Sequence, residues 1–173
     1  MKKIYSLLVI LILATSLSAS AQTSVIDRFF SKYESNDDFT VIKITPKMFS
    51  MFSKLNSSDP DAKKILNVAS KLKGLRILVK EQAKDGKVLF REASQFFTKE
   101  FEELMTIREK DNDLKFLIKE NGKGNISELI MLVGGSDTFV ALSLIGDLNL
   151  QELSAIADDM NIEGFSNIKK AKK

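Results

Sequence analysis

Tryptophan, histidine and cysteine are all absent from this chain of 173 residues, and only two prolines are present. Without histidine or cysteine, the chain cannot assemble a Ser-His-Asp or Cys-His triad, a zinc finger or a thiol redox centre. Without cysteine, no disulfide can hold the fold together, so a hydrophobic core must do so. The sequence therefore predicts a protein that is not an enzyme and that binds no metal or cofactor.

The chain also lacks a concentrated basic surface. Six of its 26 basic residues lie at the two ends: Lys2, Lys3, Lys169, Lys170, Lys172 and Lys173. The remaining 20 basic residues face 23 acidic ones, so the body is slightly acidic. Because nucleic-acid binding requires a clustered basic face, we expect no nucleic-acid partner. Residues 166–173 are predicted to form a basic flexible tail that aids solubility, with contact to anionic lipid as the alternative.

No apolar run approaches the roughly 20 residues that a membrane-spanning helix requires. The run over residues 7–14 follows the basic pair Lys2-Lys3 and precedes the small residues Ala19-Ser20-Ala21. This three-part pattern predicts a secretory signal peptide over residues 1–21, cut between Ala21 and Gln22. We therefore expect an exported soluble protein, periplasmic or secreted, with no stable membrane span after cleavage.

The mature chain is predicted to form one domain over residues 22–165. Apolar residues at helical spacing predict amphipathic helices over 24–33, from Pro46 to 55, from Pro60 to 72 with Gly74 as the stop, and over 87–101. β-Branched and aromatic runs predict strands over 39–45 and 75–82.

The second half of the chain consists of strand-like runs over 103–110, 114–121, 125–135 and 137–148, separated by short turns. Asn149, followed three residues later by Glu152, predicts a capping box that starts a closing helix over 149–160. The predicted fold class is α+β. It is an antiparallel sheet of about six strands, including a C-terminal four-strand meander, packed with amphipathic helices and closed by a C-terminal helix.

Residues 129–133 and 138–145 are apolar at nearly every position, so both faces of these strands should be buried. Such strands belong in the centre of a sheet, covered by helices or by a partner chain. We expect helices chiefly on one face, with the last helix or a partner covering the rest. A homodimer through the apolar sheet face is one such arrangement.

Gly134, Gly135, Ser136 and Asp137 form the most motif-like stretch of the chain. A phosphate-binding loop would lead into a helix, and a nucleophile elbow would also require a histidine partner. Here a strand pattern follows instead, so these residues are predicted to form a structural turn and not a site. Gly134 or Gly135 is expected to adopt the positive φ of a hairpin turn.

Three acidic pairs, Asp37-Asp38, Glu102-Glu103 and Asp158-Asp159, consist of sequence neighbours, whose side chains do not face each other. A carboxylate-dependent hydrolase is therefore the least favoured hypothesis. It would require two convergent, partly buried acids in a cleft.

Seven phenylalanines admit two interpretations: an ordinary core, or the lining of a space for a lipid or other apolar ligand between helices and sheet. They are Phe29, Phe30, Phe49, Phe52, Phe96, Phe97 and Phe101.

Several stretches carry a resemblance that spans nearly the whole mature chain. The most distinctive run from Glu102 to Ile162 and include "EELMTIRE", "LKFLIKENGKGNISELIMLVGG" and "TFVALSLIGDLNLQELSAIADDMNI". With "FTVIKIT" and "LFREA" upstream, the chain resembles a family of exported Bacteroidetes proteins catalogued as domain of unknown function 4252. The resemblance implies export in a Gram-negative cell and a single α+β domain. It supplies no activity and no functional residues.

Together these observations predict an exported, non-enzymatic binding or interaction module. A carrier of a lipid or other apolar ligand in the phenylalanine-rich space is the alternative function. The chemistry of the ligand or partner does not follow from the sequence.

Overall fold

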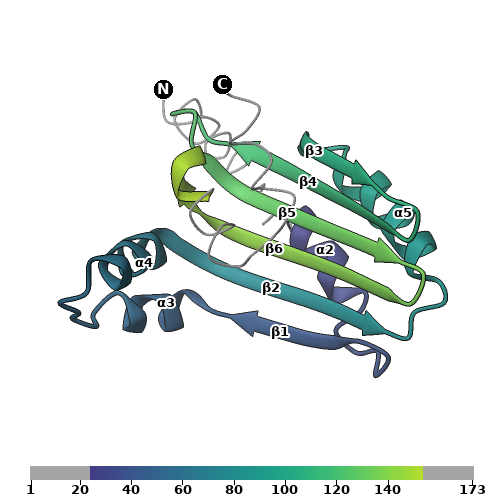
Figure 1. The fold of residues 1–173 in the computed structure, drawn as a ribbon, viewed down its shortest axis with the longest axis horizontal. Helices are drawn as coiled ribbons and strands as arrows, with labels where there is room; N and C mark the ends of the chain where they lie inside the picture. The colour runs from purple at the N-terminus through teal and green to yellow at the C-terminus, as the bar shows by residue number, and fades with distance from the viewer. Residues whose placement is uncertain (1–23, 154–173) are drawn as a thin grey trace, which may run out of the picture.

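A six-stranded antiparallel sheet is the centre of the computed structural model, which describes residues 24–153 (Figure 1). The elements follow in the order α2 (Val25–Ser31), β1 (Thr40–Ile44), α3 (Pro46–Phe52), α4 (Pro60–Lys71), β2 (Leu72–Glu81), α5 (Gly86–Phe97), β3 (Glu102–Arg108), β4 (Asn112–Glu120), β5 (Ile126–Gly135) and β6 (Thr138–Leu148). The predicted signal peptide, its cleavage point at Ala21 and Gln22, and the basic tail lie outside the described residues. None of the described helices is long and apolar enough to cross a membrane.

The strand order across the sheet is β1-β2-β6-β5-β4-β3. Strands β3 to β6 are neighbours in chain order and pair antiparallel, which confirms the predicted four-strand meander. The two strands that are apolar on both faces, β5 and β6, lie side by side in the middle. The α+β fold class and the six strands are therefore as predicted.

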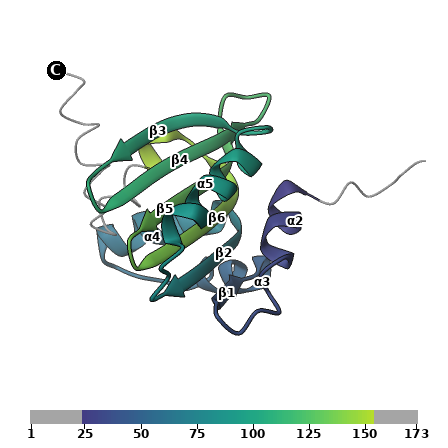
Figure 2. The ribbon, with the colours of Figure 1, turned by 90° about the vertical axis from the view of Figure 1, so that its right-hand side faces the viewer.

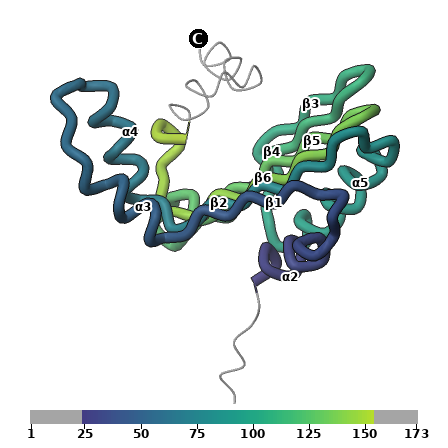
Figure 3. Tube along the Cα trace, turned by 90° about the horizontal axis from the view of Figure 1, so that it is seen from below, coloured from purple at the N-terminus to yellow at the C-terminus, as the bar shows by residue number. Residues whose placement is uncertain are grey.

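Helices α2 and α5 pack against one side of the sheet, which we call the first face (Figures 2 and 3). The ring centroids of Phe29 in α2 and Phe97 in α5 are 4.7 Å apart, and in the connection from α2 to β1 those of Tyr33 and Phe39 are 4.8 Å apart. Beneath them the sheet contributes Leu117 and Ile130, which are fully buried. This layer is the larger of the two hydrophobic cores.

The opposite side of the sheet, the second face, carries three rows of apolar side chains across β2, β6, β5 and β4. Because the strand register aligns them, each row runs straight across the four strands. The rows are Leu75-Leu144-Leu129-Ile118, Ile77-Leu142-Met131-Phe116 and Val79-Val140-Val133-Leu114. No charged side chain interrupts this grid, so water is excluded from it only where another layer covers it.

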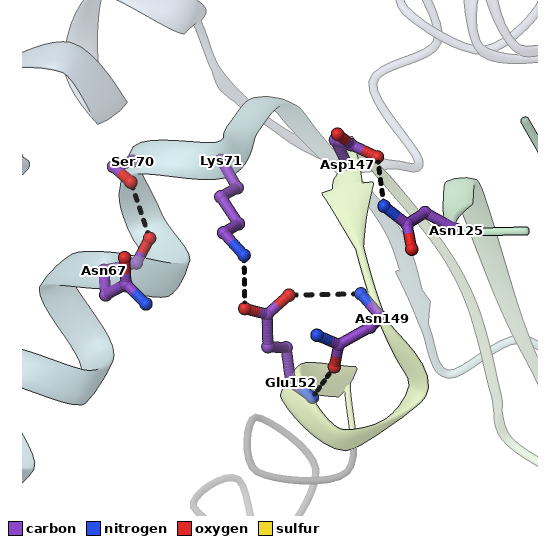
Figure 4. A network of polar contacts seen from close by, with 7 residues as sticks. All are labelled: Asn67, Ser70, Lys71, Asn125, Asp147, Asn149 and Glu152. Atoms are coloured by element: carbon purple, nitrogen blue, oxygen red, sulfur yellow. Dashed lines mark hydrogen bonds and ion pairs between the residues drawn. The ribbon is translucent and has the colours of Figure 1, made fainter. Parts of the chain in front are cut away.

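The first of these rows is covered by the end of α4 and by the turn that follows β6. Val68 of α4 and Leu153 pack into the same core as this row. The predicted capping box is present, since Asn149 and Glu152 exchange backbone-to-side-chain hydrogen bonds of 2.9 and 3.1 Å (Figure 4). Glu152 also accepts a hydrogen bond from Lys71, the last residue of α4. The predicted closing helix beyond Leu153 lies outside the described residues.

Two predicted boundaries are wrong. Gly74 does not end α4, because the helix ends at Lys71 and β2 begins at the next residue, with Gly74 at a register shift opposite Ile145. The turn expected over residues 111–113 is shorter, because Asn112 and Asp113 pair with β5 as part of β4. In both places the pairing to a long neighbouring strand overrides a local turn or stop signal.

The first residue of α5, Gly86, sits directly against the β5–β6 hairpin. A Cβ atom at this position would lie 2.3 Å from the carbonyl oxygen of Thr138 and 2.6 Å from that of Gly135. Both obstacles are backbone atoms of central strands, which cannot move aside. Only glycine therefore allows α5 to approach the sheet this closely.

Replacing Gly86 with alanine should destabilise the fold by roughly 3 kcal/mol, because the added methyl group overlaps fixed backbone. Gly122→Ala is the matched control: a Cβ at Gly122, in the β4–β5 turn, meets nothing within 4 Å. The control should stay within about 0.5 kcal/mol of the wild type in urea denaturation. Equal stability of the two variants would contradict the close approach.

Candidate functional site

Gly134, Gly135, Ser136 and Asp137 occupy the β5–β6 connection. The two glycines are the last residues of β5, and Ser136 and Asp137 are the exposed link to β6. The carbonyl oxygen of Asp137 accepts a 2.7 Å hydrogen bond from the backbone N–H of Ala83. This bond ties the turn to the segment between β2 and α5, and no helix starts at the glycines to hold an anion.

The expectation that Gly134 or Gly135 has a positive φ is wrong. Among the described glycines, Gly124 is the one with a positive φ, of 76°. Glycine is required at 134 for a different reason: a Cβ there would lie 2.3 Å from the Cβ of Phe90 in α5. At 135, it would lie 2.6 Å from the side-chain oxygen of Asn112. The two glycines make room for neighbours and do not bend the backbone.

The acidic pairs noted in the sequence do not form a site. Asp37 and Asp38 are exposed ahead of β1, and Glu102 and Glu103 are exposed at the start of β3. Glu103 accepts hydrogen bonds of 2.8 Å from Lys115 and from Thr106, and these bonds lower its pKa. The pair Asp158-Asp159 lies outside the described residues. Among residues 24–153, no group of three or more acidic side chains is placed to hold a metal ion.

A cavity of about 280 Å³ on the first face brings together two acids that the sequence analysis did not single out. It lies between the start of α2, the end of the α5–β3 loop and the strands β4 and β5. Its lining is Ser24, Val25, Arg28, Glu100, Phe101, Lys119 and Glu128. No local pattern links these residues, because they come from four separate segments of the chain.

Glu128 is the most perturbed acid of this cavity. Burial raises the pKa of its carboxyl group above the ordinary value of 4.5, while Lys119, directly opposite on β4, acts in the other direction. Glu100 accepts a 3.3 Å ion-pair hydrogen bond from Arg28, and both side chains are nearly half exposed. The two acids therefore differ in environment, but each also has a basic neighbour.

The phenylalanines differ in their placement. Phe29, Phe30, Phe97 and Phe101 are buried on the first face, where their rings contact one another, and Phe96 is partly buried beside them. Phe49 is buried in α3, whereas Phe52, expected inside, is 42% exposed. The first-face rings therefore contact one another in the layer between the helices and the sheet.

The second face is open at one end. Its third row consists of Val79, Val140, Val133 and Leu114, and the register extends it to Ile107 on the edge strand β3. None of these five side chains is buried, whereas three of the four in the first row are. An apolar row across five strands that remains partly in water is the strongest candidate for an interaction surface on the sheet.

Replacing Glu128 with glutamine should stabilise the fold at neutral pH, because burial disfavours the charged carboxylate. The folded-state pKa lies above the ordinary 4.5, so the penalty is fully present above the folded pKa and disappears as the pH falls below 4.5. The advantage of Glu128→Gln over the wild type should therefore shrink on acidification. Urea denaturation at a series of pH values measures it. A variant less stable at neutral pH would show that the pairing with Lys119 outweighs burial.

Comparison with known proteins places the chain in a family. The model of the family described as "Domain of unknown function (DUF4252)" matches residues 33–156, which begin after α2 and take in every strand of the sheet. A search of curated proteins found no match. Because the match covers well over half of the chain and agrees with the resemblance of its motifs, the protein belongs to the DUF4252 family.

Proposed function

We propose that the protein is an exported, non-enzymatic interaction module that works through the open end of its second face, with a second copy of the chain as its partner. The observation that carries the proposal is the third row, in which Val79, Val140, Val133, Leu114 and Ile107 are all partly exposed. Soluble monomers seldom leave a contiguous apolar surface of this kind in water.

The character of the second face favours a copy of the same chain. The three rows carry no charged group, so a partner needs no complementary charge and only a matching apolar surface. A two-fold axis through the open end would place the third row of one chain against that of the other. Two sheets packed in this way interdigitate their side chains at about 10 Å.

The first face offers less for a function. An apolar carrier requires an empty space between helices and sheet, and there the ring centroids of Phe29 and Phe97 are 4.7 Å apart. The Glu100–Glu128 cavity, at about 280 Å³, lies at the lower limit of small-molecule sites of roughly 300 Å³. With Glu100 paired to Arg28, it does not favour a hydrolase over an interaction module.

Sedimentation velocity tests the proposal on the chain from Gln22 to Lys173. The wild type should sediment as a dimer at tens of micromolar, a range in which weak apolar interfaces are occupied. Val140→Lys should shift it to a monomer, because a charge in the third row would face its symmetry mate. Ile107→Lys, at the edge strand, is a second variant less able to disturb the fold.

Val88→Lys on α5 is the matched control, because Val88 is an exposed apolar side chain, 45% accessible, away from the second face. It should leave the dimer intact. Circular dichroism establishes that each variant is folded. A wild type that stays monomeric throughout the concentration range, or a dimer insensitive to both third-row variants, would overturn the proposal.

A further inference from the structure

The helices α3 and α4 form a helical lobe, which we define as residues 45–71. The lobe projects beyond the ends of β1 and β2, away from the layer formed by α2 and α5 (Figures 1 and 3). Within these two helices, both fully described, Phe49 is the sole buried residue. The lobe is therefore held by few buried contacts, and most of its side chains face water.

Exposed apolar side chains concentrate on this lobe. Of the eight large apolar side chains that are exposed in the described chain, five lie between residues 48 and 65. They are Met48, Met51, Phe52, Leu55 and Ile65, with exposed fractions of 42% to 58%. The sequence predicted an amphipathic helix from Pro46 to 55, and the structure turns the first four of these side chains outward.

The exposed residues of α3 form one stripe. Met48, Met51, Phe52 and Leu55 follow the i, i+3, i+4, i+7 spacing of a single helical face, which continues into the turn after Phe52. At about 3.6 residues per turn, Lys47 and Lys54 both lie beside Met51 on one side of the stripe, and the buried Phe49 lies on the other side. An apolar stripe bordered by lysines is the pattern of a helix that lies flat in a membrane interface.

The charge of the chain divides along the same boundary. The lobe has five lysines and two aspartates, a formal charge of +3. The rest of the described chain has 15 basic and 18 acidic residues, a formal charge of −3. An anionic surface therefore attracts the lobe and repels the remainder, which orients the molecule before contact.

The basic residues of the lobe are all lysines, while arginines occur elsewhere at 28, 76, 91 and 108. Arginine recognises the carboxylates of an acidic protein through a planar, bidentate fork, whereas lysine acts as a mobile point charge. Lysine stems also let the charged groups reach headgroups while neighbouring apolar side chains sit deeper. The composition suits the diffuse charge of a lipid surface better than a defined set of carboxylates.

We propose that the helical lobe docks on an anionic phospholipid surface, with Met48, Met51, Phe52 and Leu55 inserted among the acyl chains and the exposed lysines of the lobe on the headgroups. This docking is independent of the interaction proposed for the second face. It requires no membrane-spanning segment, and it presents the open end of the sheet away from the lipid.

Vesicle flotation of the chain from Gln22 to Lys173 tests the docking. The protein should float with vesicles of equal parts phosphatidylglycerol and phosphatidylethanolamine, and much less with vesicles of phosphatidylcholine alone. Met51→Gln with Leu55→Gln should reduce partitioning by roughly tenfold, because two inserted side chains are lost. Lys47→Glu with Lys54→Glu should reduce it by at least roughly tenfold, and high salt should weaken wild-type binding.

Two controls separate the lobe from other contributions. Val88→Gln with Lys99→Glu changes an exposed apolar and an exposed basic side chain outside the lobe and should leave partitioning unchanged. Replacing the four lysines of residues 169–173 with glutamine should leave the dependence on the lobe variants intact.

Three results would overturn the docking: no flotation with anionic vesicles, equal flotation of wild-type and lobe variants, or binding that disappears with the tail lysines alone. Saturable binding of the lobe to an acidic protein, with no flotation, would assign the surface to a protein partner instead. Because Val140→Lys leaves the lobe intact, its flotation should equal that of the wild type. The failure of one proposal is thus distinguishable from the failure of the other.

Discussion

The pairing of β5 with β6 is the constraint from which the rest of the architecture follows. Both strands are apolar on both faces, so the hairpin cannot lie at an edge or leave either side in water without a large loss of hydrophobic stabilisation. Flanking strands therefore pair with the hairpin on each side, and both faces of the sheet require other side chains to cover them. The two faces are covered to different extents. Helices α2 and α5 close the first face with aromatic rings, whereas the second face is closed at one end only.

This unequal cover explains why the two faces differ so much in chemistry. On the first face, charged groups such as Arg76 and Lys80 surround the helices, and Arg76 pairs with Asp27 of α2. On the second face, the three rows contain no charge at all. Uncharged rows that stay partly exposed cost solubility, and association with another surface would offset that cost.

Periodicity alone predicted the helices, the strands and the meander, because apolar patterns with periods of 3.6 and 2 are local properties of the sequence. It could not predict which side of α3 faces the core. Met48, Met51, Phe52 and Leu55 form the better apolar stripe, yet Phe49 is buried instead. The direction of α3 is set by β1 and by its packing on α4, which are tertiary contacts.

The glycines at 134 and 135 were likewise placed in the right connection and given the wrong physical reason, since the close approach of Phe90 and Asn112 is invisible in the sequence. The cavity at Glu128 left no local signal, because its lining comes from four segments.

The joints of the lobe carry a mechanical consequence. Lys71 ends α4 and Leu72 begins β2, so no linker separates them, and Thr45 alone separates β1 from α3. Two such direct connections leave the lobe little freedom to rotate relative to the sheet. The hydrogen bond from Lys71 to Glu152 adds a third attachment beyond β6. Any surface that binds the lobe therefore also fixes the direction of the strands relative to that surface. A bound molecule would therefore have one defined orientation relative to that surface.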